Sequence, residues 1–149
     1  MKNSQYIFSN KTYKILLFVW TIIVFTLLLM PQSSFSHAPR FPFLAFLRWK
    51  NMDKVVHFVM FAIESWLVYR VKEQSKRNIQ QNILKKRYLG CFTIISIFSM
   101  GLFTEILQGL TYNTQKRCFS LWDLLFDTLA SIFVVVVINC IFKKIKLPF

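Results

Sequence analysis

Glycine, proline, cysteine and acidic residues are all scarce in this sequence of 149 residues, and each shortage excludes a class of protein. With three Gly and four Pro, the chain is neither collagen-like nor of low complexity. The spacing of its three cysteines, Cys91, Cys118 and Cys140, matches neither a metal site nor a redox motif. We therefore expect them to pack as small apolar side chains, and no disulfide framework is predicted.

Apolar side chains dominate the composition. Hydrophobic residues make up 55% of the chain and charged residues only 17%, against about 25% charged residues in a typical soluble domain. So small a globule has too little interior to hide this much apolar surface. A disordered chain is also excluded, because disorder requires low hydrophobicity. The composition predicts a membrane protein with a single domain over residues 1–149.

Four apolar stretches are candidate transmembrane helices, covering about residues 15–30, 55–70, 88–107 and 121–142. A helix needs roughly 20 apolar residues to cross a bilayer, with about 17 as the lower limit. The third and fourth stretches are long enough, whereas the first and second depend on flanking anchors such as Tyr13 and Trp49. We therefore predict an all-α, polytopic membrane protein whose four transmembrane helices pack as a small bundle.

Basic residues set the predicted orientation of these spans. The chain holds 19 Lys and Arg against 6 Asp and Glu, and basic residues concentrate in the cytoplasmic segments that flank spans. Seven lie between the second and third spans, namely Arg70, Lys72, Lys76, Arg77, Lys85, Lys86 and Arg87. With that segment inside, both termini are cytoplasmic and the protein is a multi-pass protein of the cytoplasmic (inner) cell membrane. Its expected partner there is the bilayer with its anionic headgroups, and no nucleic-acid partner is predicted.

The first apolar stretch has a second interpretation. A basic N-terminal region, an apolar run and then Ser36-His37-Ala38 resemble a secretory signal peptide with its small-x-small cleavage site. Cleavage there would leave three spans in the same orientation. The sequence leaves both interpretations open.

Polar residues recur at the predicted outer ends of three spans. Residues three or four apart share one face of a helix, and three pairs have this spacing: Asp53 and His57, Glu105 and Gln108, and Asp123 and Asp127. All three pairs lie within about two turns of the same membrane surface. Arg117 lies in the short loop that leads into the fourth span. The sequence therefore predicts one polar cluster near the extracytoplasmic surface, made of Asp53, Lys54, His57, Glu105, Gln108, Arg117, Asp123 and Asp127.

This cluster has two interpretations, which the sequence does not separate. It could be a network of ion pairs and hydrogen bonds that holds the helices together, or it could bind a ligand. We expect no metal and no cofactor, because the chain has no HExxH or comparable signature and zinc would usually recruit more His or Cys.

Glu64 lies apart from the cluster, seven residues beyond His57 and near the middle of the second span. An ionisable group at this depth costs free energy, so a functional role is the default hypothesis for Glu64. Glu64 could line a polar cavity, or it could be protonated and hydrogen-bonded to a neighbour such as Ser96 or Ser99. We favour the protonated form.

Three short blocks carry a resemblance to a known family. In order and spacing they resemble the VanZ-like family of small integral membrane proteins, and together they span residues 53–130. The chain has Asp127 where the family usually has Asn, which adds a charge, and Ala130 where the family usually has Gly, which removes a close-packing point. The blocks are Asp53-Lys54-x-x-His57-Phe58, Thr104-Glu105-x-x-Gln108 and Arg117-x5-Asp123-x3-Asp127.

The family takes its name from a protein that lowers susceptibility to the glycopeptide antibiotic teicoplanin. The resemblance implies a bacterial cell-envelope protein with that phenotype. Such a protein would bind a glycopeptide or a lipid-linked cell-wall precursor. It implies no reaction. One alternative is a small membrane enzyme that acts on a lipid-linked cell-wall intermediate with His57 or a carboxylate as general base. Another is an ion- or proton-coupled transporter subunit that uses Glu64 and forms an oligomer.

Overall fold

The computed structural model describes residues 10–29, 52–75, 83–110 and 119–144. These residues form four helices, α1 (Asn10–Leu28), α3 (Met52–Ser75), α4 (Ile83–Leu110) and α6 (Leu121–Lys144), and they include no strand. The all-α prediction is therefore confirmed for this part of the chain. Arg117, Cys118 and the Ser36-His37-Ala38 segment lie outside the described residues.

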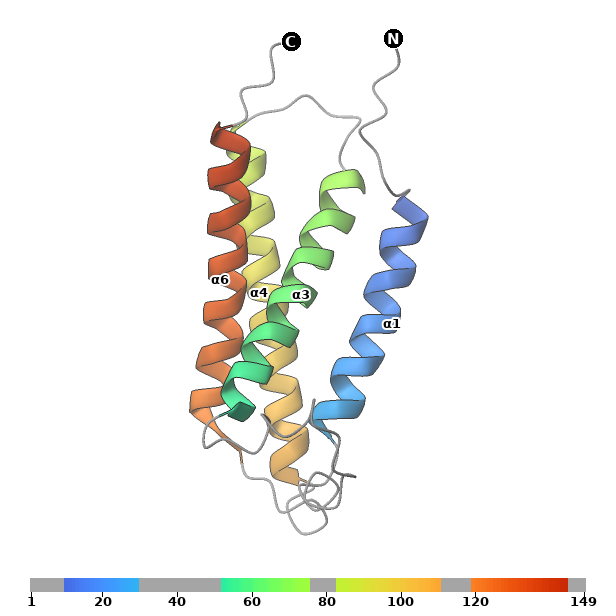
Figure 1. Ribbon diagram of the computed structural model, residues 1–149, viewed down its shortest axis with the longest axis vertical. Helices are drawn as coiled ribbons and strands as arrows, with labels where there is room; N and C mark the ends of the chain where they lie inside the picture. Colours follow the sequence, from blue (N-terminus) through green and yellow to red (C-terminus); the bar gives the residue numbers. More distant parts are fainter. Residues whose placement is uncertain (1–9, 30–51, 76–82, 111–118, 145–149) are drawn as a thin grey trace.

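The four helices run alternately down and up, as Figure 1 shows. We call the end where α3 and α6 begin the lower end of the bundle, and the opposite end, where α1 begins and α6 ends, the upper end. α3 is the central helix, because it packs against α1, α4 and α6, and α4 also packs against α6. The polar residues His57, Glu64 and Ser65 of α3 are buried among these neighbouring helices.

Three of the four helices are long and apolar enough to cross a membrane, over Asn10–Leu28 of α1, Arg87–Leu110 of α4 and Leu121–Cys140 of α6. α3 is long enough at 24 residues but is not sufficiently apolar, since polar residues such as His57 and Glu64 interrupt it. The structure thus supports a membrane protein with three such helices, one fewer than the sequence predicted.

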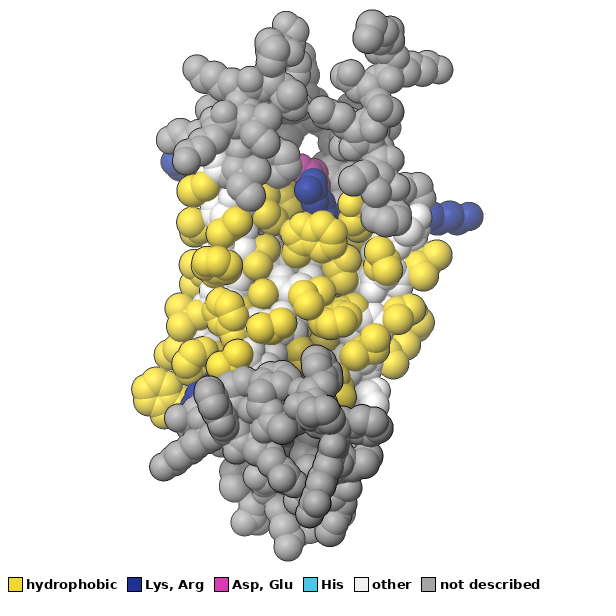
Figure 2. Space-filling view, viewed as in Figure 1, with side chains coloured by type: hydrophobic (Ala, Val, Ile, Leu, Met, Phe, Trp, Pro, Cys, Tyr) yellow, Lys and Arg dark blue, Asp and Glu magenta, His cyan; other side chains and the backbone are white. Residues whose placement is uncertain are grey.

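Many large apolar side chains are exposed on the outside of the bundle, unlike the surface of a soluble protein. Apolar side chains cover the middle of the face shown in Figure 2, and basic side chains appear at its edges. The exposed residues of α3 in its described part are all apolar, while its interior face carries polar groups. That exposed stripe consists of Val55, Val59, Ile63 and Trp66.

The interior combines apolar packing with close approaches of α4 to α6. One apolar cluster is built from α1, α3, α4 and α6 and includes Phe61 and Ala130. Another lies towards the upper end, where a Cβ added to Gly90 of α4 would lie 2.9 Å from Cγ1 of Val135. Glycine therefore permits α4 and α6 to pack closely. This packing brings the last turns of α4 beside the first turns of α6.

Candidate functional site

The lower end of the bundle holds a buried polar cluster contributed by three helices. α3 supplies Lys54 and His57 from its first turns, and α6 supplies Asp123 and Asp127 from its first turns. Glu105 and Gln108 come from the last turns of α4. The structure thus brings these six residues to one end of the bundle. We call this set the lower cluster; it consists of Lys54, His57, Glu105, Gln108, Asp123 and Asp127.

The deepest contact of the lower cluster joins α3 to α6. Nδ1 of His57 lies 3.2 Å from Oδ1 of Asp127, and both side chains are almost fully buried. An ionised Asp127 fixes the tautomer in which Nδ1 donates this bond and Nε2 remains an acceptor. The imidazole also stacks on the ring of Phe61, one turn further along α3. His57 is therefore held in one orientation by a carboxylate and an aromatic ring.

Gly101 of α4 provides the space that Asp127 occupies. A Cβ added to Gly101 would lie 3.0 Å from Oδ2 of Asp127 and 3.3 Å from Cδ1 of Leu124. The carboxylate of Asp127 is thus packed directly against the backbone of α4 on one side and bonded to His57 on the other. We did not identify Gly101 from the sequence, although its place one turn before Glu105 puts it on the same face of α4.

The outer edge of the lower cluster is an ion pair between Lys54 and Asp123. Nζ of Lys54 lies 3.7 Å from Oδ1 of Asp123, and the two side chains are 29% and 14% exposed. Asp123 is in the first turn of α6, where a negative charge suits the helix dipole. Its backbone N–H donates to Oγ of Ser120 at 3.3 Å, so Ser120 is the N-cap of α6. This pair is the part of the lower cluster that reaches the surface.

Glu105 and Gln108 both bond to the ends of other helices. Oε2 of Glu105 accepts a hydrogen bond of 2.7 Å from the backbone N–H of Ser120, at the beginning of α6. Nε2 of Gln108 donates to the carbonyl oxygen of Leu28, the last residue of α1, at 3.0 Å. Helix ends have backbone groups without intrahelical partners. α4 therefore satisfies one such group on α6 and another on α1.

Three buried carboxylate oxygens of the lower cluster lack a hydrogen-bond partner among the described residues. They are Oε1 of Glu105, Oδ2 of Asp127 and Oδ1 of Asp123. The side chains of Glu105 and Asp127 are fully buried, whereas Asp123 has Lys54 at 3.7 Å. Unsatisfied buried polar atoms are rare in folded proteins, and each calls for an explanation such as strain, a bound ion or a functional role. The described residues contain no group of three His, Cys, Asp or Glu arranged to hold a metal ion.

Three predicted site residues fall outside the lower cluster. Arg117 lies outside the described residues, and Asp53 lies in α3 but its side chain is not described. Glu64 lies deeper in the bundle, where its Oε1 is 2.7 Å from Oγ1 of Thr21 on α1. The prediction that Ser96 or Ser99 of α4 is its partner is wrong, because Thr21 of α1 takes this place. Glu64 faces α1, whereas Ser99 is exposed and donates to the carbonyl oxygen of Ile95 in its own helix.

Sequence reasoning missed Ser120 and Thr21 as partners of the predicted acids. Ser120 carried a usable signal, because a Ser followed three residues later by an acid at the start of an apolar run is typical of a helix N-terminus. Thr21 carried none, since a single hydroxyl in an apolar stretch is uninformative. Comparison with protein-family models, with curated proteins and with solved structures gave no match.

Proposed function

We propose that this chain is a VanZ-like protein of the cytoplasmic membrane that lowers susceptibility to teicoplanin, with the lower cluster beneath the extracytoplasmic surface. One observation carries the proposal: the three sequence blocks behind the resemblance contact one another at the lower end. His57 of the first block bonds Asp127 of the third. Glu105 of the second bonds the backbone of Ser120, which lies within the third.

α3 serves as the fourth span in this proposal. Its exposed stripe is apolar over three turns, and His57, Glu64 and Ser65 are buried against the other helices. This arrangement suits a helix surrounded by lipid, where ionisable groups face the bundle interior. The low hydropathy of α3 then reflects its central position, since the residues that lower it are covered by protein.

The proposed orientation places the upper end in the cytoplasm. α1 begins at the upper end with Lys11 and Lys14, and α3 ends there with Arg70 and Lys72. α4 begins at the same end, with Arg87 in its first turns. Basic residues at one end of a bundle favour the cytoplasmic side for that end.

The exposed edge of the lower cluster determines what it can bind. Lys54 is the most accessible charged group there, and an ammonium group suits the phosphate of a lipid-linked cell-wall precursor. Asp123 positions the ammonium group, while the buried bond between His57 and Asp127 holds α3 against α6 beneath it. The lower cluster is thus both an interhelical tie and a shallow anion-binding edge.

Expression in a teicoplanin-sensitive bacterium tests the proposal. The wild-type gene should raise the minimum inhibitory concentration of teicoplanin above that of the empty vector, and Lys54→Ala should lower it again. Lys72→Ala is the matched control, because it removes a lysine from the opposite end of the same helix. The proposal fails if the wild type, produced at normal levels in the membrane, is indistinguishable from the empty vector.

A membrane enzyme is the second candidate function, and the contact between His57 and Asp127 favours it. A carboxylate that holds Nδ1 of a histidine leaves Nε2 available as a general base. Purified protein would then convert a lipid-linked saccharide, and Asp127→Asn would reduce the rate while Glu73→Gln at the upper end would not. If the wild type converts none of a panel of lipid-linked saccharides, this candidate is abandoned.

A further inference from the structure

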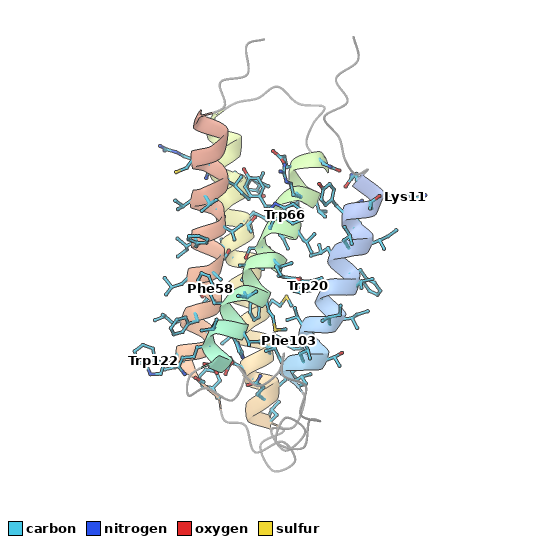
Figure 3. The ribbon with its side chains drawn as sticks, viewed as in Figure 1. Lys11, Trp20, Phe58, Trp66, Phe103 and Trp122 are labelled. Carbon is cyan, nitrogen blue, oxygen red and sulfur yellow. The ribbon has the colours of Figure 1, made fainter. Side chains whose placement is uncertain are left out.

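α1 has few buried residues, and its apolar packing on α3 is supplemented by polar contacts. Its buried residues are Tyr13, Val24 and Leu28. Figure 3 shows the side chain of Trp20 between α1 and α3, and its Nε1 donates to the carbonyl oxygen of Met60 at 3.2 Å. In lipid, helices associate through packing and hydrogen bonds, without a hydrophobic driving force between them. Each polar contact of α1 therefore matters for its position.

The neighbouring residue on α1, Thr21, lies between two oxygen atoms. Its Oγ1 is 2.8 Å from the carbonyl oxygen of Leu17 and 2.7 Å from Oε1 of Glu64. A hydroxyl group has one proton and can donate to only one of these oxygens. An ionised carboxylate has no proton to contribute, so with an ionised Glu64 one of the two short contacts would lack a hydrogen.

A proton on Glu64 supplies the missing hydrogen. Oε1 of Glu64 then donates to Oγ1 of Thr21, and Thr21 donates to the carbonyl oxygen of Leu17. Both short contacts become hydrogen bonds, and the chain of donors ends on a backbone acceptor. The geometry of α1 and α3 is thus consistent with a neutral carboxylic acid at Glu64 and leaves an ionised Glu64 short of donors.

The surroundings of Glu64 offer no compensation for a negative charge. The side chain is 2% exposed, and its Oε2 is buried without a hydrogen-bond partner among the described residues. The ion pairs of α3 in the described part of the chain lie at its two ends: Lys54–Asp123, His57–Asp127 and Arg70–Glu73.

Charged groups on the other helices are also engaged or positioned elsewhere. On α4, Glu105 bonds the N-terminus of α6, and Arg87 is exposed at the upper end. On α1, Lys11 and Lys14 are exposed near the start of the helix. A buried carboxylate without a cationic partner is strongly unfavourable, so the proton is the ion that this position can hold.

We propose that Glu64 is an intramembrane proton-binding site. Its proton completes a series of hydrogen bonds, from Glu64 to Thr21 and from Thr21 to the carbonyl oxygen of Leu17, that holds α1 against α3. Release of the proton leaves a charge that the hydroxyl of Thr21 alone cannot satisfy, and α1 then separates from α3. This site is distinct from the lower cluster, and the proposal stands whether or not the chain affects teicoplanin susceptibility.

Infrared difference spectroscopy of the full chain in lipid vesicles tests the protonation state. The spectrum of the wild type minus that of Glu64→Gln at neutral pH should contain the C=O stretching band of a carboxylic acid. Labelling with ¹³C-glutamate should shift this band, because only Glu64, Glu73 and Glu105 are then labelled. A difference spectrum that contains carboxylate bands alone overturns the proposal.

Distance measurements between spin labels test the link to α1. Labels would replace the exposed residues Ile15 of α1 and Ile95 of α4 in a chain whose cysteines are changed to alanine. The wild-type distance distribution should be narrow at low pH and should broaden as the infrared band disappears at high pH. Glu64→Gln should stay narrow at both pH values, because its amide N–H replaces the acid proton.

Two threonine variants provide the matched comparison. Thr21→Val removes the hydroxyl at constant shape and should broaden the distribution at both pH values, and Thr21→Ser should restore the wild-type behaviour. Thr26→Val is the control, since Thr26 makes the same bond to the carbonyl four residues before it but is exposed. The proposal is wrong if Thr21→Val and Thr26→Val behave alike, or if the width of the wild-type distance distribution does not change when the proton is lost.

Discussion

Glu105 of α4 accepts a hydrogen bond from the backbone N–H of Ser120 at 2.7 Å, so a side chain of one helix caps the beginning of the next. Ser120 in turn caps the same helix through its own hydroxyl, which accepts from the N–H of Asp123. The first turn of α6 therefore has two backbone donors satisfied by two different side chains. This double cap joins the beginning of α6, where Asp123 and Asp127 lie, to α4.

Glu105→Ala should destabilise the protein by about 1–3 kcal/mol, because it leaves the N–H of Ser120 without its acceptor. Glu105→Gln should be milder, since the amide oxygen can accept the same bond. Unfolding in mixed micelles, followed by tryptophan fluorescence as SDS increases, measures the difference. Equal stability of Glu105→Ala and the wild type would show that the contact contributes nothing.

Gly101→Ala should destabilise the bundle by about 1–3 kcal/mol through overpacking. The added methyl group would lie 3.0 Å from Oδ2 of Asp127, so the carboxylate must shift from its place between α4 and His57. Gly109→Ala on the same helix is the control, because its Cβ would meet Phe119 at an ordinary 3.7 Å. Since alanine favours helix more than glycine does, the control should be neutral or stabilising by up to about 1 kcal/mol. The same unfolding measurement compares the two variants, and the reverse order would contradict the packing.

Ile63→Lys tests whether α3 spans the membrane with its apolar stripe towards lipid. Ile63 is near the middle of α3 and belongs to the exposed stripe. A lysine there should oppose membrane insertion by about 3 kcal/mol and reduce the amount of folded protein. Val55→Lys near the lower end should be tolerated, because a lysine can extend to the interface. The amount of protein extracted from membranes as a monodisperse species is the readout. Equal yields would place this face of α3 in water.

Cysteine labelling tests the orientation. Under the proposed topology, a membrane-impermeant maleimide should label Cys118 in intact cells, or in spheroplasts where an outer membrane intervenes. A cysteine introduced at Lys76 in a variant without Cys118 should be labelled only after the membrane is opened. The opposite pattern would invert the topology and place the lower cluster at the cytoplasmic surface.

The helices themselves could largely be predicted from the sequence, with systematic differences at their ends. The stretch predicted over 121–142 is α6, which runs to Lys144, and the stretch over 88–107 is α4, which begins at Ile83. α1 begins at Asn10, five residues before the apolar stretch. The apolar pattern follows the part of a helix that meets lipid, whereas hydrogen bonding continues the helix into polar residues at its ends.

The sequence by itself determined where the helices lie, that the chain has the apolar helices of a membrane protein, and that polar residues of three helices reach the same end of the bundle. Helical periodicity and the rise per residue are enough for this, because both are local properties of the chain. Only the tertiary structure decided which partner each polar residue meets: Thr21 for Glu64, the backbone of Ser120 for Glu105, and the carbonyl of Leu28 for Gln108. These choices depend on how each helix is rotated about its axis and on which helix lies beside it, and neither follows from spacing along one chain.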